Sequence, residues 1–270
     1  MTSPTHAGSS YVAPDASIVS VITPLFIEGI DFIADAWESV QSQQLPADMS
    51  LEWVVQEDAD HPEFAERLAE LVGGDSRVRY AFNGRHCGQA VTRNMAFQRS
   101  RGQLIYALDQ DDILLPGALH ALASEMALRP EVMWVTGHTQ RLFDDGSVVE
   151  RDDPIEDGPL PAGYLLELFE NGITIAFYAT ATMFRRSALQ LLGGWPAIVA
   201  GEDSELQLAM GAAFDGFRCG HLLVSRRKWA GQAVQAGWYA TPDLESVTPR
   251  YARALAIDAA RRAGMFTATS

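Results

Sequence analysis

The sequence predicts a single α/β domain with a mixed, mostly parallel central sheet flanked by helices. In the first half of the 270 residues, short apolar runs alternate with segments of helical periodicity, which is typical of βαβ units. After Pro116 a hairpin pattern joins the helices and strands, so antiparallel strands are expected to complete the sheet. A chain of this length can bury one large core, and no break in the pattern requires a second independent domain.

The first half is expected to contain four strands and three helices. Ile18–Ile22 is a β-branched run closed by Pro24, which is typical of a buried strand. Gly73 and Gly74 end the second helical pattern. The expected strands are Ile18–Ile22, Leu51–Val55, Val78–Phe82 and Leu104–Leu108, and the expected helices are Asp31–Gln44, Pro62–Val72 and Gln89–Arg99.

The second half mixes helices with a hairpin. Asp144-Asp145-Gly146 is typical of a hairpin turn between Arg141–Phe143 and Ser147–Glu150. The acidic, Pro-rich stretch Asp152–Pro161 is expected to be a loop. The other expected segments are the helices Ala118–Leu128 and Pro249–Ala263, the strand Met133–Gly137, and an alternation of strand and helix over Ala179–Arg185, Ser187–Leu192, Glu202–Ala213 and Phe217–Val224.

Composition argues against several classes of function. The formal net charge of −15 repels phosphate backbones, so nucleic acid is not an expected partner. No run approaches the roughly 18 apolar residues that span a bilayer. Met1–Ser17 lacks the basic start and apolar centre of a secretory signal, so the cytoplasm is the expected location. Cys87 and Cys219 have no zinc or C-x-x-C spacing and are expected to be reduced thiols without a special task.

The segment that points to chemistry is Leu108-Asp109-Gln110-Asp111-Asp112, directly after an expected strand. Open α/β sheets bind ligands at the carboxyl ends of their strands. Three carboxylates in four residues repel one another unless a cation shares them, and Mg²⁺ or Mn²⁺ commonly joins carboxylates to substrate phosphates. In isolation such a segment is more often a solvated acidic turn or a helix N-cap. The prediction of a metal site therefore depends on the neighbouring motifs.

Several motifs in order resemble the family 2 glycosyltransferases of GT-A fold, over about Ser17 to Gln232. They are similar to the family's V-S-V-I-I-P strand, S-I-L-x-Q helix end, V-D-D strand end, G-x-x-x-A-R-N segment, D-x-D-D signature, and L-G-G-F and G-E-D elements. In this chain they read Val19–Pro24, Ser39–Gln43, Glu52–Asp58, Gly88–Ala96 with Thr92-Arg93-Asn94, Asp109–Asp112, Leu192–Trp195 and Gly201–Asp203. Each motif is weak alone, but the ordered set is hard to reach by accident.

The resemblance implies an inverting, hexosyltransferase-type enzyme with Mn²⁺ or Mg²⁺ as cofactor. Such an enzyme moves a sugar from a nucleoside diphosphate to a hydroxyl or amine of an acceptor. Residues 1–16 are expected to be a flexible tail, 17–240 the GT-A domain and 241–270 a C-terminal helical extension. Within the domain, 17–116 would bind the nucleotide and 117–240 the acceptor.

The resemblance also places nucleotide contacts at the ends of the first strands. Pro24 and Phe26 would contact the nucleotide, with the Phe26 ring stacked on the base; the alternative for Phe26 is an ordinary core position. Asp58, or Glu57 in its place, would accept the N–H of uracil or thymine, so a UDP- or dTDP-sugar is the expected donor. Either carboxylate could instead cap the helix at Pro62.

The diphosphate and the metal are implied to lie beside the acidic segment. Arg93 would lie next to the diphosphate and brace Asp109, although a surface arginine is the alternative. Asp109 would contact the ribose or the metal, and Gln110 would contact the nucleotide. Asp111 is implied to be the principal metal ligand.

Asp203 is the implied general base, with Glu202 as its neighbour or as a contact to a sugar hydroxyl. A carboxylate in this role removes the proton from the acceptor hydroxyl while that oxygen attacks the anomeric carbon, on the face opposite the leaving nucleotide. The adjacent charges are expected to raise the pKa of one of the two carboxyls. Gly201-Glu202-Asp203 is also a good helix N-terminus, and both roles can hold at once.

The sequence departs from the family pattern at two places. Ile27-Glu28 follow Phe26 where a polar residue is frequent. In the segment that resembles R-x-H-P-G-Q, whose histidine is a further metal ligand, the chain reads RKWAGQ and Trp229 takes the histidine's place. The third metal ligand therefore stays open, and coordination is expected to rest on Asp111, the diphosphate and water. Arg226–Lys228 would offset phosphate charge or form a solvated basic turn.

Two other functions stay open. A catalytically inactive sugar-nucleotide-binding module is favoured by the missing histidine, but the retained Asp58, Asp109, Asp111 and Asp203 argue against it. A sugar-1-phosphate nucleotidyltransferase is disfavoured because no G-x-G-T-R-rich loop follows the first strand. The chain also has no G-x-G-x-x-G and no P-loop motif.

The acceptor is expected to be a small molecule or a glycan, bound around Gly172–Thr182 and Trp195–Asp203. The closing helix is expected either to pack on the domain or to form a homodimer contact.

Overall fold

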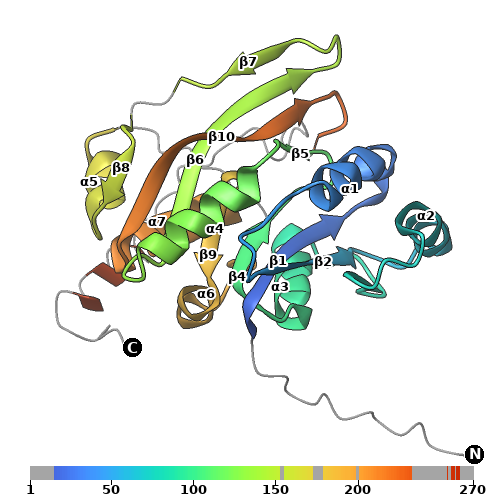
Figure 1. The fold of residues 1–270 in the computed structure, drawn as a ribbon, viewed down its shortest axis with the longest axis horizontal. Helices are drawn as coiled ribbons and strands as arrows, with labels where there is room; N and C mark the ends of the chain where they lie inside the picture. Colours follow the sequence, from blue (N-terminus) through green and yellow to red (C-terminus); the bar gives the residue numbers. More distant parts are fainter. Residues whose placement is uncertain are drawn as a thin grey trace, which may run out of the picture.

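The protein forms one ten-stranded sheet with helices on both faces (Figure 1). The computed structural model describes residues 15–152, 155–172, 179–198 and 201–232, together with Ala254, Ile257, Asp258, Ala260 and Arg261. The strands are β1 (Asp15–Leu25), β2 (Ser50–Glu57), β3 (Val78–Phe82), β4 (Gly102–Ala107), β5 (Ile113–Leu114), β6 (Trp134–Phe143), β7 (Val148–Glu150), β8 (Gly158–Leu160), β9 (Thr182–Arg185) and β10 (Gly216–Lys228). The helices are η1 (Ile27–Phe32), α1 (Ile33–Gln41), α2 (Pro62–Val72), α3 (Gln89–Arg99), α4 (Ala118–Leu128), α5 (Tyr164–Glu170), η2 (Ala179–Ala181), α6 (Arg186–Leu192) and α7 (Glu202–Ala213).

The strand order is β3-β2-β1-β4-β9-β6-β10-β5, with β7 paired to β6 and β8 to β10. The first four strands are parallel: β1 pairs in parallel with β2 and β4, and β2 with β3. β9 runs antiparallel to both of its neighbours, β4 and β6, while β10 is parallel to β6. The carboxyl ends of β1, β2, β4, β6 and β10 therefore lie at the same edge, and the predicted mixed sheet with a parallel core is confirmed.

Two apolar cores fill the two faces of the sheet. Successive strand residues point to opposite faces, so Val21 and Ile22 of β1 enter different cores, and both are fully buried. On one face the core includes buried side chains of α1, α2 and α4. On the other it includes buried side chains of α3, α5, α6 and α7. Each large apolar side chain buried in this way contributes roughly 1.5–3 kcal/mol, so these layers hold the loops at the carboxyl edge in place.

Strand β1 extends further than the sequence predicts. It continues through Pro24 to Leu25, although Pro24 was expected to close it. The pairing of β1 with β4 ends at Ile22, whose carbonyl accepts from the N–H of Leu108. The nitrogen of Pro24, two residues on, faces this same side, where the ladder has already ended, so its missing N–H removes no ladder bond. On the other side β1 stays paired with β2 as far as Leu25 and Glu57.

The bounds of two other segments also differ from those that the sequence predicts. The helix expected over Asp31–Gln44 is divided into the 3₁₀ turn η1 and the shorter α1. The stretch Asp152–Pro161, expected to be a loop, contains β8, which pairs antiparallel with β10. Its Pro159 is tolerated because β8 has a single neighbour within the described residues, β10, and an edge strand can lack a donor.

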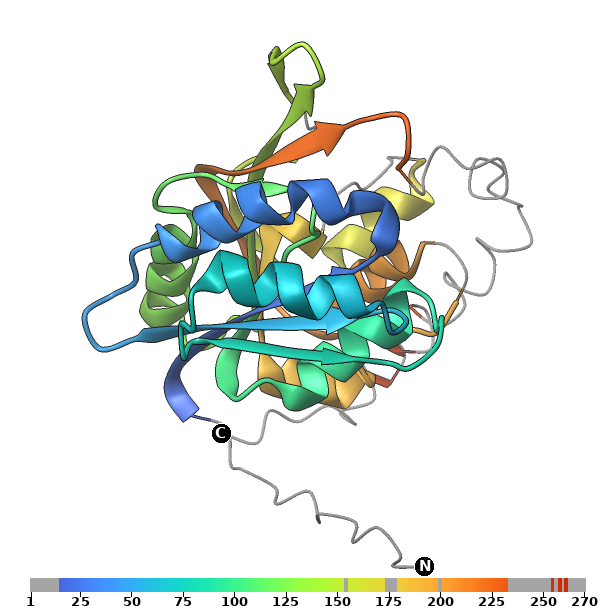
Figure 2. The same ribbon diagram turned by 90° about the vertical axis from the view of Figure 1, so that its right-hand side faces the viewer.

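The hairpin predicted at Asp144-Asp145-Gly146 is confirmed, since Phe143 and Ser147 are joined by a backbone hydrogen bond and β6 pairs with β7. In Figure 2 the β6–β7 hairpin projects beyond the helices.

The predicted ends of the chain lie mostly outside the described residues. β1 begins at Asp15, inside the expected tail of residues 1–16, and residues 1–14 are not described. Of the closing helix expected over Pro249–Ala263, Arg261 donates from Nε to the carbonyl of Ala212 at 2.9 Å and pairs with Asp258.

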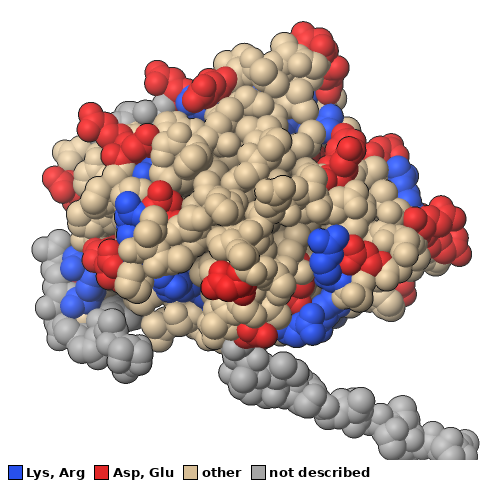
Figure 3. Space-filling model, in the orientation of Figure 1, with Lys and Arg blue, Asp and Glu red and all other residues tan. Residues whose placement is uncertain are grey.

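The surface around α4 is mostly uncharged. On the face that Figure 3 shows, acidic and basic side chains lie mainly toward the periphery and the centre is covered by other residues. Helix α4, which lies in front in this orientation, carries one carboxylate, Glu125. None of the described helices is long and apolar enough to cross a membrane.

Candidate active site

The acidic loop Asp109–Asp112 lies at the carboxyl end of β4, beside the end of β1. Gln110 fixes it there: its Nε2 donates to the carbonyl of Phe26 at 2.9 Å, and its Oε1 accepts from the N–H of Phe26 at 2.6 Å. A Cβ on Gly29 would lie 1.8 Å from Gln110 Nε2, so this close approach requires glycine. Gln110 is buried and Phe26 half-buried. The backbone of Phe26 is thus locked, while part of its side chain stays accessible.

Arg93 is the centre of the largest charged cluster at this edge. It extends from α3 and is fully buried. Its Nη2 donates to Asp109 Oδ1 at 2.6 Å, and its Nη1 donates to Asp203 Oδ1 at 2.7 Å and to Glu202 Oε1 at 3.0 Å. Burial by itself lowers the pKa of Arg93, but the three carboxylates raise it above its usual value. One permanently charged guanidinium therefore joins the acidic loop to the start of α7.

Glu202 and Asp203 occupy the first turn of α7. Helix α7 starts after Gly201, which is in the left-handed region (φ +79°), and the helix dipole favours carboxylates in this turn. Burial raises the pKa of Glu202 to about 7; Asp203 adds to this and Arg93 opposes it. Burial also raises the pKa of Asp203, and Arg93 again opposes the shift.

The two Asp203 oxygens have different surroundings. Oδ1 accepts from Arg93 and from Nε1 of Trp195, at 3.0 Å. No donor to Oδ2 occurs among the described residues, and the side chain is 30% exposed. Asp203 therefore has one oxygen that two donors hold and one that no described residue donates to.

The hydrogen bond from Trp195 to Asp203 was not predicted from the sequence, although Trp195 lies in the expected acceptor region. Asn94 accepts from the N–H of Trp195 at 2.9 Å and donates to its carbonyl at 2.6 Å. A Cβ on Gly194 would lie 2.3 Å from Asn94 Oδ1, so the glycine permits this pairing. The Arg93-Asn94 and L-G-G-W segments were both recognised, but no local pattern signals that they interlock and aim the indole at Asp203.

Glu57 and Asp58 form a separate cluster at the end of β2. Asp58 is buried and accepts from the N–H groups of Cys87, at 2.5 Å, and Gly88, at 2.9 Å. Burial would raise its pKa, but these hydrogen bonds hold the pKa below its usual value. Glu57 is fully buried and accepts from the N–H of His61 and from the hydroxyl of Tyr80.

Glu57 thus anchors the start of α2, and Asp58 anchors the loop that leads into α3. Within the described residues, no hydrogen bond or ion pair joins either carboxylate to Arg93. Pro24 lies next to them, aligned with Gln56 in the sheet.

Asp111 and Asp112 are covered by the end of β10 and the segment that follows it. Asp111 Oδ2 accepts from Trp229 Nε1 at 2.8 Å and from Gln232 Nε2 at 3.0 Å. Asp112 is buried, accepts from the N–H of Arg227 at 3.2 Å and lies 3.6 Å from Nε of Arg226. Burial raises the pKa of Asp112 to about 8, with Arg226 opposing the shift. The sequence placed Trp229 in a ligand position but did not predict that it would bind Asp111.

The donor set fits a divalent cation only in part. Asp109 and Asp111 are half-buried carboxylates, and in each of them the protein donors use a single oxygen. The described residues contain no group of three or more His, Cys, Asp or Glu side chains placed to hold a metal ion. Carboxylate oxygens suit Mg²⁺ and Mn²⁺. Asp111 and Asp109 therefore fit a cation whose remaining ligands come from a phosphate group and water.

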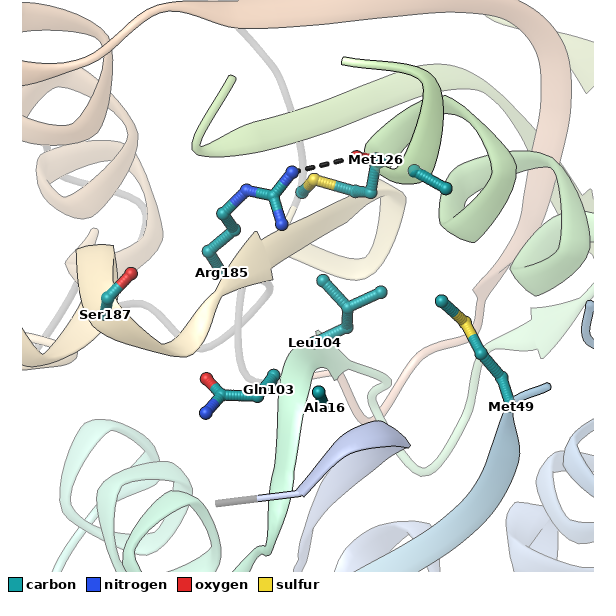
Figure 4. Close-up of a pocket in the computed structure, with 8 residues that line it drawn as sticks. Ala16, Met49, Gln103, Leu104, Met126, Arg185 and Ser187 are labelled. Atoms are coloured by element: carbon teal, nitrogen blue, oxygen red, sulfur yellow. Dashed lines mark hydrogen bonds between the residues drawn. The ribbon is translucent and has the colours of Figure 1, made fainter. Parts of the chain in front are cut away.

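A cavity of about 320 Å³ lies away from this cluster. Its lining includes Ala16 near the start of β1 and Gln103 and Leu104 near the start of β4, so it is at the opposite edge of the sheet. Arg185 closes one side and donates to the carbonyl of Met126 at 2.8 Å (Figure 4). Since ligands of open α/β sheets bind at the carboxyl edge, this cavity is not the functional site.

The sheet order and the acidic loop after β4 define an α/β protein of the glycosyltransferase GT-A class. The chain belongs to glycosyl transferase family 2, whose family model matches residues 20–193. The match runs from β1 to the end of α6 and confirms the resemblance found in the sequence.

Solved structures confirm the fold. Residues 1–349 of Staphylococcus aureus TarS in complex with UDP-GlcNAc match with a TM-score of 0.62 at 16% identity, over 81% of this chain and 61% of that one. The same TarS fragment in complex with UDP matches with a TM-score of 0.59 at 16% identity, over 78% and 60%. The uncharacterized glycosyltransferase MJ1057 of Methanocaldococcus jannaschii is 24% identical over 140 residues, which is 52% of this chain and 48% of that protein. The chain thus spans about half to three-fifths of the length of these relatives.

Proposed function

We propose that this protein is an inverting, metal-assisted hexosyltransferase that moves a sugar from a UDP- or dTDP-sugar to a hydroxyl or amine of a small-molecule or glycan acceptor. One observation carries the proposal: the buried Arg93 holds Asp203, the candidate base, and Asp109 of the acidic loop within 2.7 Å of the same guanidinium. Family membership supports it, as do the UDP-GlcNAc and UDP complexes of the similar TarS structures. The cytoplasmic location and a homodimer remain predictions.

The nucleotide is proposed to lie over the carboxyl ends of β1, β2 and β4. The accessible part of Phe26 would stack on the base. Asp58 already accepts three N–H groups, from Cys87, Gly88 and the Asn83 side chain. His86 Nδ1 also lies 3.5 Å from this carboxylate, so the N3–H of a uracil or thymine would replace one of these partners. The UDP-GlcNAc and UDP complexes of the similar TarS structures support a pyrimidine diphosphate as the donor.

Asp111, together with Asp109, would hold Mn²⁺ or Mg²⁺ against the diphosphate. A bound divalent cation supplies Lewis-acid stabilisation of the charge that develops on a leaving diphosphate. Arg93 keeps Asp109 in place, because its Nη2 donates to Oδ1 and leaves Oδ2 without a donor among the described residues.

Asp203 is proposed to be the general base. The acceptor oxygen attacks the anomeric carbon, its proton passes to the free Oδ2 of Asp203, and the bond from the anomeric carbon to the diphosphate oxygen breaks. Arg93 and Trp195 hold Oδ1, so the carboxylate is oriented before the acceptor binds. The raised pKa makes Asp203 a stronger base than an exposed aspartate. A positioned base of this kind contributes roughly 10²–10⁴-fold to the rate.

Substitution Asp203→Asn tests the base. The variant is expected to bind UDP as the wild type does and to lose sugar transfer by about 10²–10⁴-fold. Asp31→Asn, at a carboxylate that is 82% exposed, is the matched control and should transfer normally. Wild-type transfer rates from Asp203→Asn would refute the assignment of the base.

Nucleotide binding is tested by calorimetry with UDP, dTDP and GDP, in Mn²⁺, Mg²⁺ or EDTA, for the wild type and Asp111→Ala. Binding of one pyrimidine diphosphate that requires both the metal and Asp111 is expected. Tighter binding of GDP would refute the pyrimidine assignment. If no nucleotide binds to the folded protein, the acidic loop is a structural turn.

The alternative is a sugar-nucleotide-binding module without turnover. It is favoured by the two protein donors on Asp111 Oδ2, which occupy part of the candidate metal ligand. Nucleotide binding without transfer to any acceptor, and without hydrolysis of the sugar nucleotide, is the result that this alternative predicts.

A further inference from the structure

The segment after β10 makes a specific contact with the acidic loop. Trp229 Nε1 and Gln232 Nε2 both donate to the same oxygen of Asp111, Oδ2, at 2.8 and 3.0 Å. Gln232 Nε2 also donates to the carbonyl of Arg227 at 2.6 Å, which closes the turn. Within the described residues no donor reaches Oδ1 of Asp111. The two oxygens of Asp111 therefore differ in their hydrogen-bond partners before any ligand binds.

The indole of Trp229 is held in place by its surroundings. Its ring packs against Phe32 of η1 with centroids 5.0 Å apart and a tilt of 59°. The guanidinium of Arg227 lies 4.5 Å from the centre of the same Phe32 ring and binds Asp35 at 2.5 Å. A Cβ on Gly231 would lie 2.0 Å from the indole, so the turn fits the ring only with glycine there. The N–H of Trp229 is thus a preorganised donor toward Asp111.

An indole cannot replace a metal-binding imidazole. Its nitrogen is a donor only and has no lone pair for a cation. In this position it instead occupies Asp111 Oδ2, together with Gln232, and leaves Oδ1 as the oxygen open to a cation. Asp109, the second carboxylate, offers at most Oδ2, because its Oδ1 accepts from Arg93 and Gln89. The protein by itself thus offers too few oxygen ligands for Mn²⁺ or Mg²⁺, which take about six.

We infer that Trp229 is a positioning residue that limits Asp111 to one cation-binding oxygen and so makes cation binding depend on a bound nucleoside diphosphate. The inference rests on the proposed function, because it requires the cation and the diphosphate to share the Asp111 site. The phosphate oxygens supply the ligands that the chain lacks, so cation and nucleotide bind together.

The test is Mn²⁺ binding, followed by the electron paramagnetic resonance signal of free Mn²⁺, with and without UDP. The wild type is expected to bind Mn²⁺ at least about tenfold more tightly with UDP than without it. Without UDP, Trp229→His should bind Mn²⁺ at least about tenfold more tightly than the wild type, the lower end of the effect that residues around a metal ligand typically have.

Trp229→Phe is the matched variant, because it keeps an aromatic ring at this position and removes the N–H donor. Its affinity for Mn²⁺ without UDP should lie between those of the wild type and Trp229→His. Equal Mn²⁺ affinities of Trp229→Phe and the wild type would show that the indole donor does not restrain Asp111. No gain in Trp229→His would show that residue 229 does not face the cation. Urea midpoints identify any variant that fails to fold.

Calorimetric titration of UDP into the same proteins separates this inference from the proposed function. If UDP binds to none of them, the nucleotide site itself is wrong. If UDP and Mn²⁺ bind together to the wild type but the Trp229 variants behave alike, the nucleotide site stands and the role of Trp229 is refuted.

Discussion

Replacing Arg93 by methionine removes the one cation that the described structure places among Asp109, Glu202 and Asp203. The three contacts of 2.6, 3.0 and 2.7 Å are buried on the arginine side, which is 0% exposed. Removing one partner from a buried ion pair typically costs about 3–5 kcal/mol, because the opposite charge is left uncompensated. Methionine is a long, flexible side chain that can fill much of the same space. The loss in the free energy of unfolding therefore reflects the removed charge more than the changed packing.

The matched control is Arg67→Met. Arg67 pairs with Asp31 at 3.0 Å, but the two side chains are 44% and 82% exposed. Exposed pairs contribute about 0–1 kcal/mol. We therefore expect the free energy of unfolding to fall by at least about 2 kcal/mol more in Arg93→Met than in Arg67→Met. Urea unfolding followed by tryptophan fluorescence measures both variants.

The loss in Arg93→Met should depend on pH. The folded-state pKa of Glu202 is about 7 with Arg93 present, above its ordinary value of 4.5, and removal of the guanidinium raises it further. A carboxyl whose pKa is raised on folding contributes stability that is complete below its unfolded pKa and is lost as the pH rises through its folded pKa. The deficit should thus be larger at about pH 8 than at about pH 5.5. A deficit no larger than that of Arg67→Met, or one that grows toward acid, would refute the shared-guanidinium cluster.

Two further predictions concern the loops around this cluster. Gly193 and Gly194 both have positive φ, but only at Gly194 would a Cβ meet another side chain, at 2.3 Å. Gly194→Ala should therefore lower the free energy of unfolding by at least about 1 kcal/mol more than Gly193→Ala does, as measured in thermal melts. Equal losses in the two variants would contradict this. Asp58→Asn should cost about 1–3 kcal/mol near neutral pH, because one amide group cannot accept from both Cys87 and Gly88. Although burial would raise the pKa of Asp58, these hydrogen bonds hold the pKa below 3.8. The stabilisation is therefore present above that value, and the difference in stability between the variant and the wild type should shrink as the pH falls further. A difference in urea midpoints that does not change with pH would contradict this.

Elements whose signals are local could be predicted from the amino-acid sequence. The helices α2, α3, α4 and α7 begin and end where the pattern predicts. In α2 the causes are visible: Pro62 occupies the first turn, where its missing N–H is harmless, and Gly73 ends the helix with φ +58°. The acidic segments after β2 and β4 also follow strands that the sequence predicts, because the carboxyl ends of these two strands are marked by the change from apolar to polar residues.

The pairing of strands that are distant in the chain could not be predicted from the sequence. β1 runs past Pro24 because its neighbour on one side ends at Ala107 while β2 on the other side continues. β8 exists because β10 has an unpaired edge at Gly216–Arg218, which no property of residues 158–160 reveals. Strand ends depend on partners far away in the chain, whereas helix ends depend on residues within one turn.

In the candidate site, too, some features were predicted from the sequence and others depend on the tertiary structure. The sequence supplied the types and the order of the charged residues, and a resemblance supplied expected roles for them. Only the tertiary structure brought Arg93 to Asp203, 110 residues away, and Trp229 to Asp111, 118 residues away. Such contacts depend on how α3, α7 and the end of β10 pack on a common sheet. That packing results from the burial of both apolar faces at once, and no short stretch of sequence encodes it.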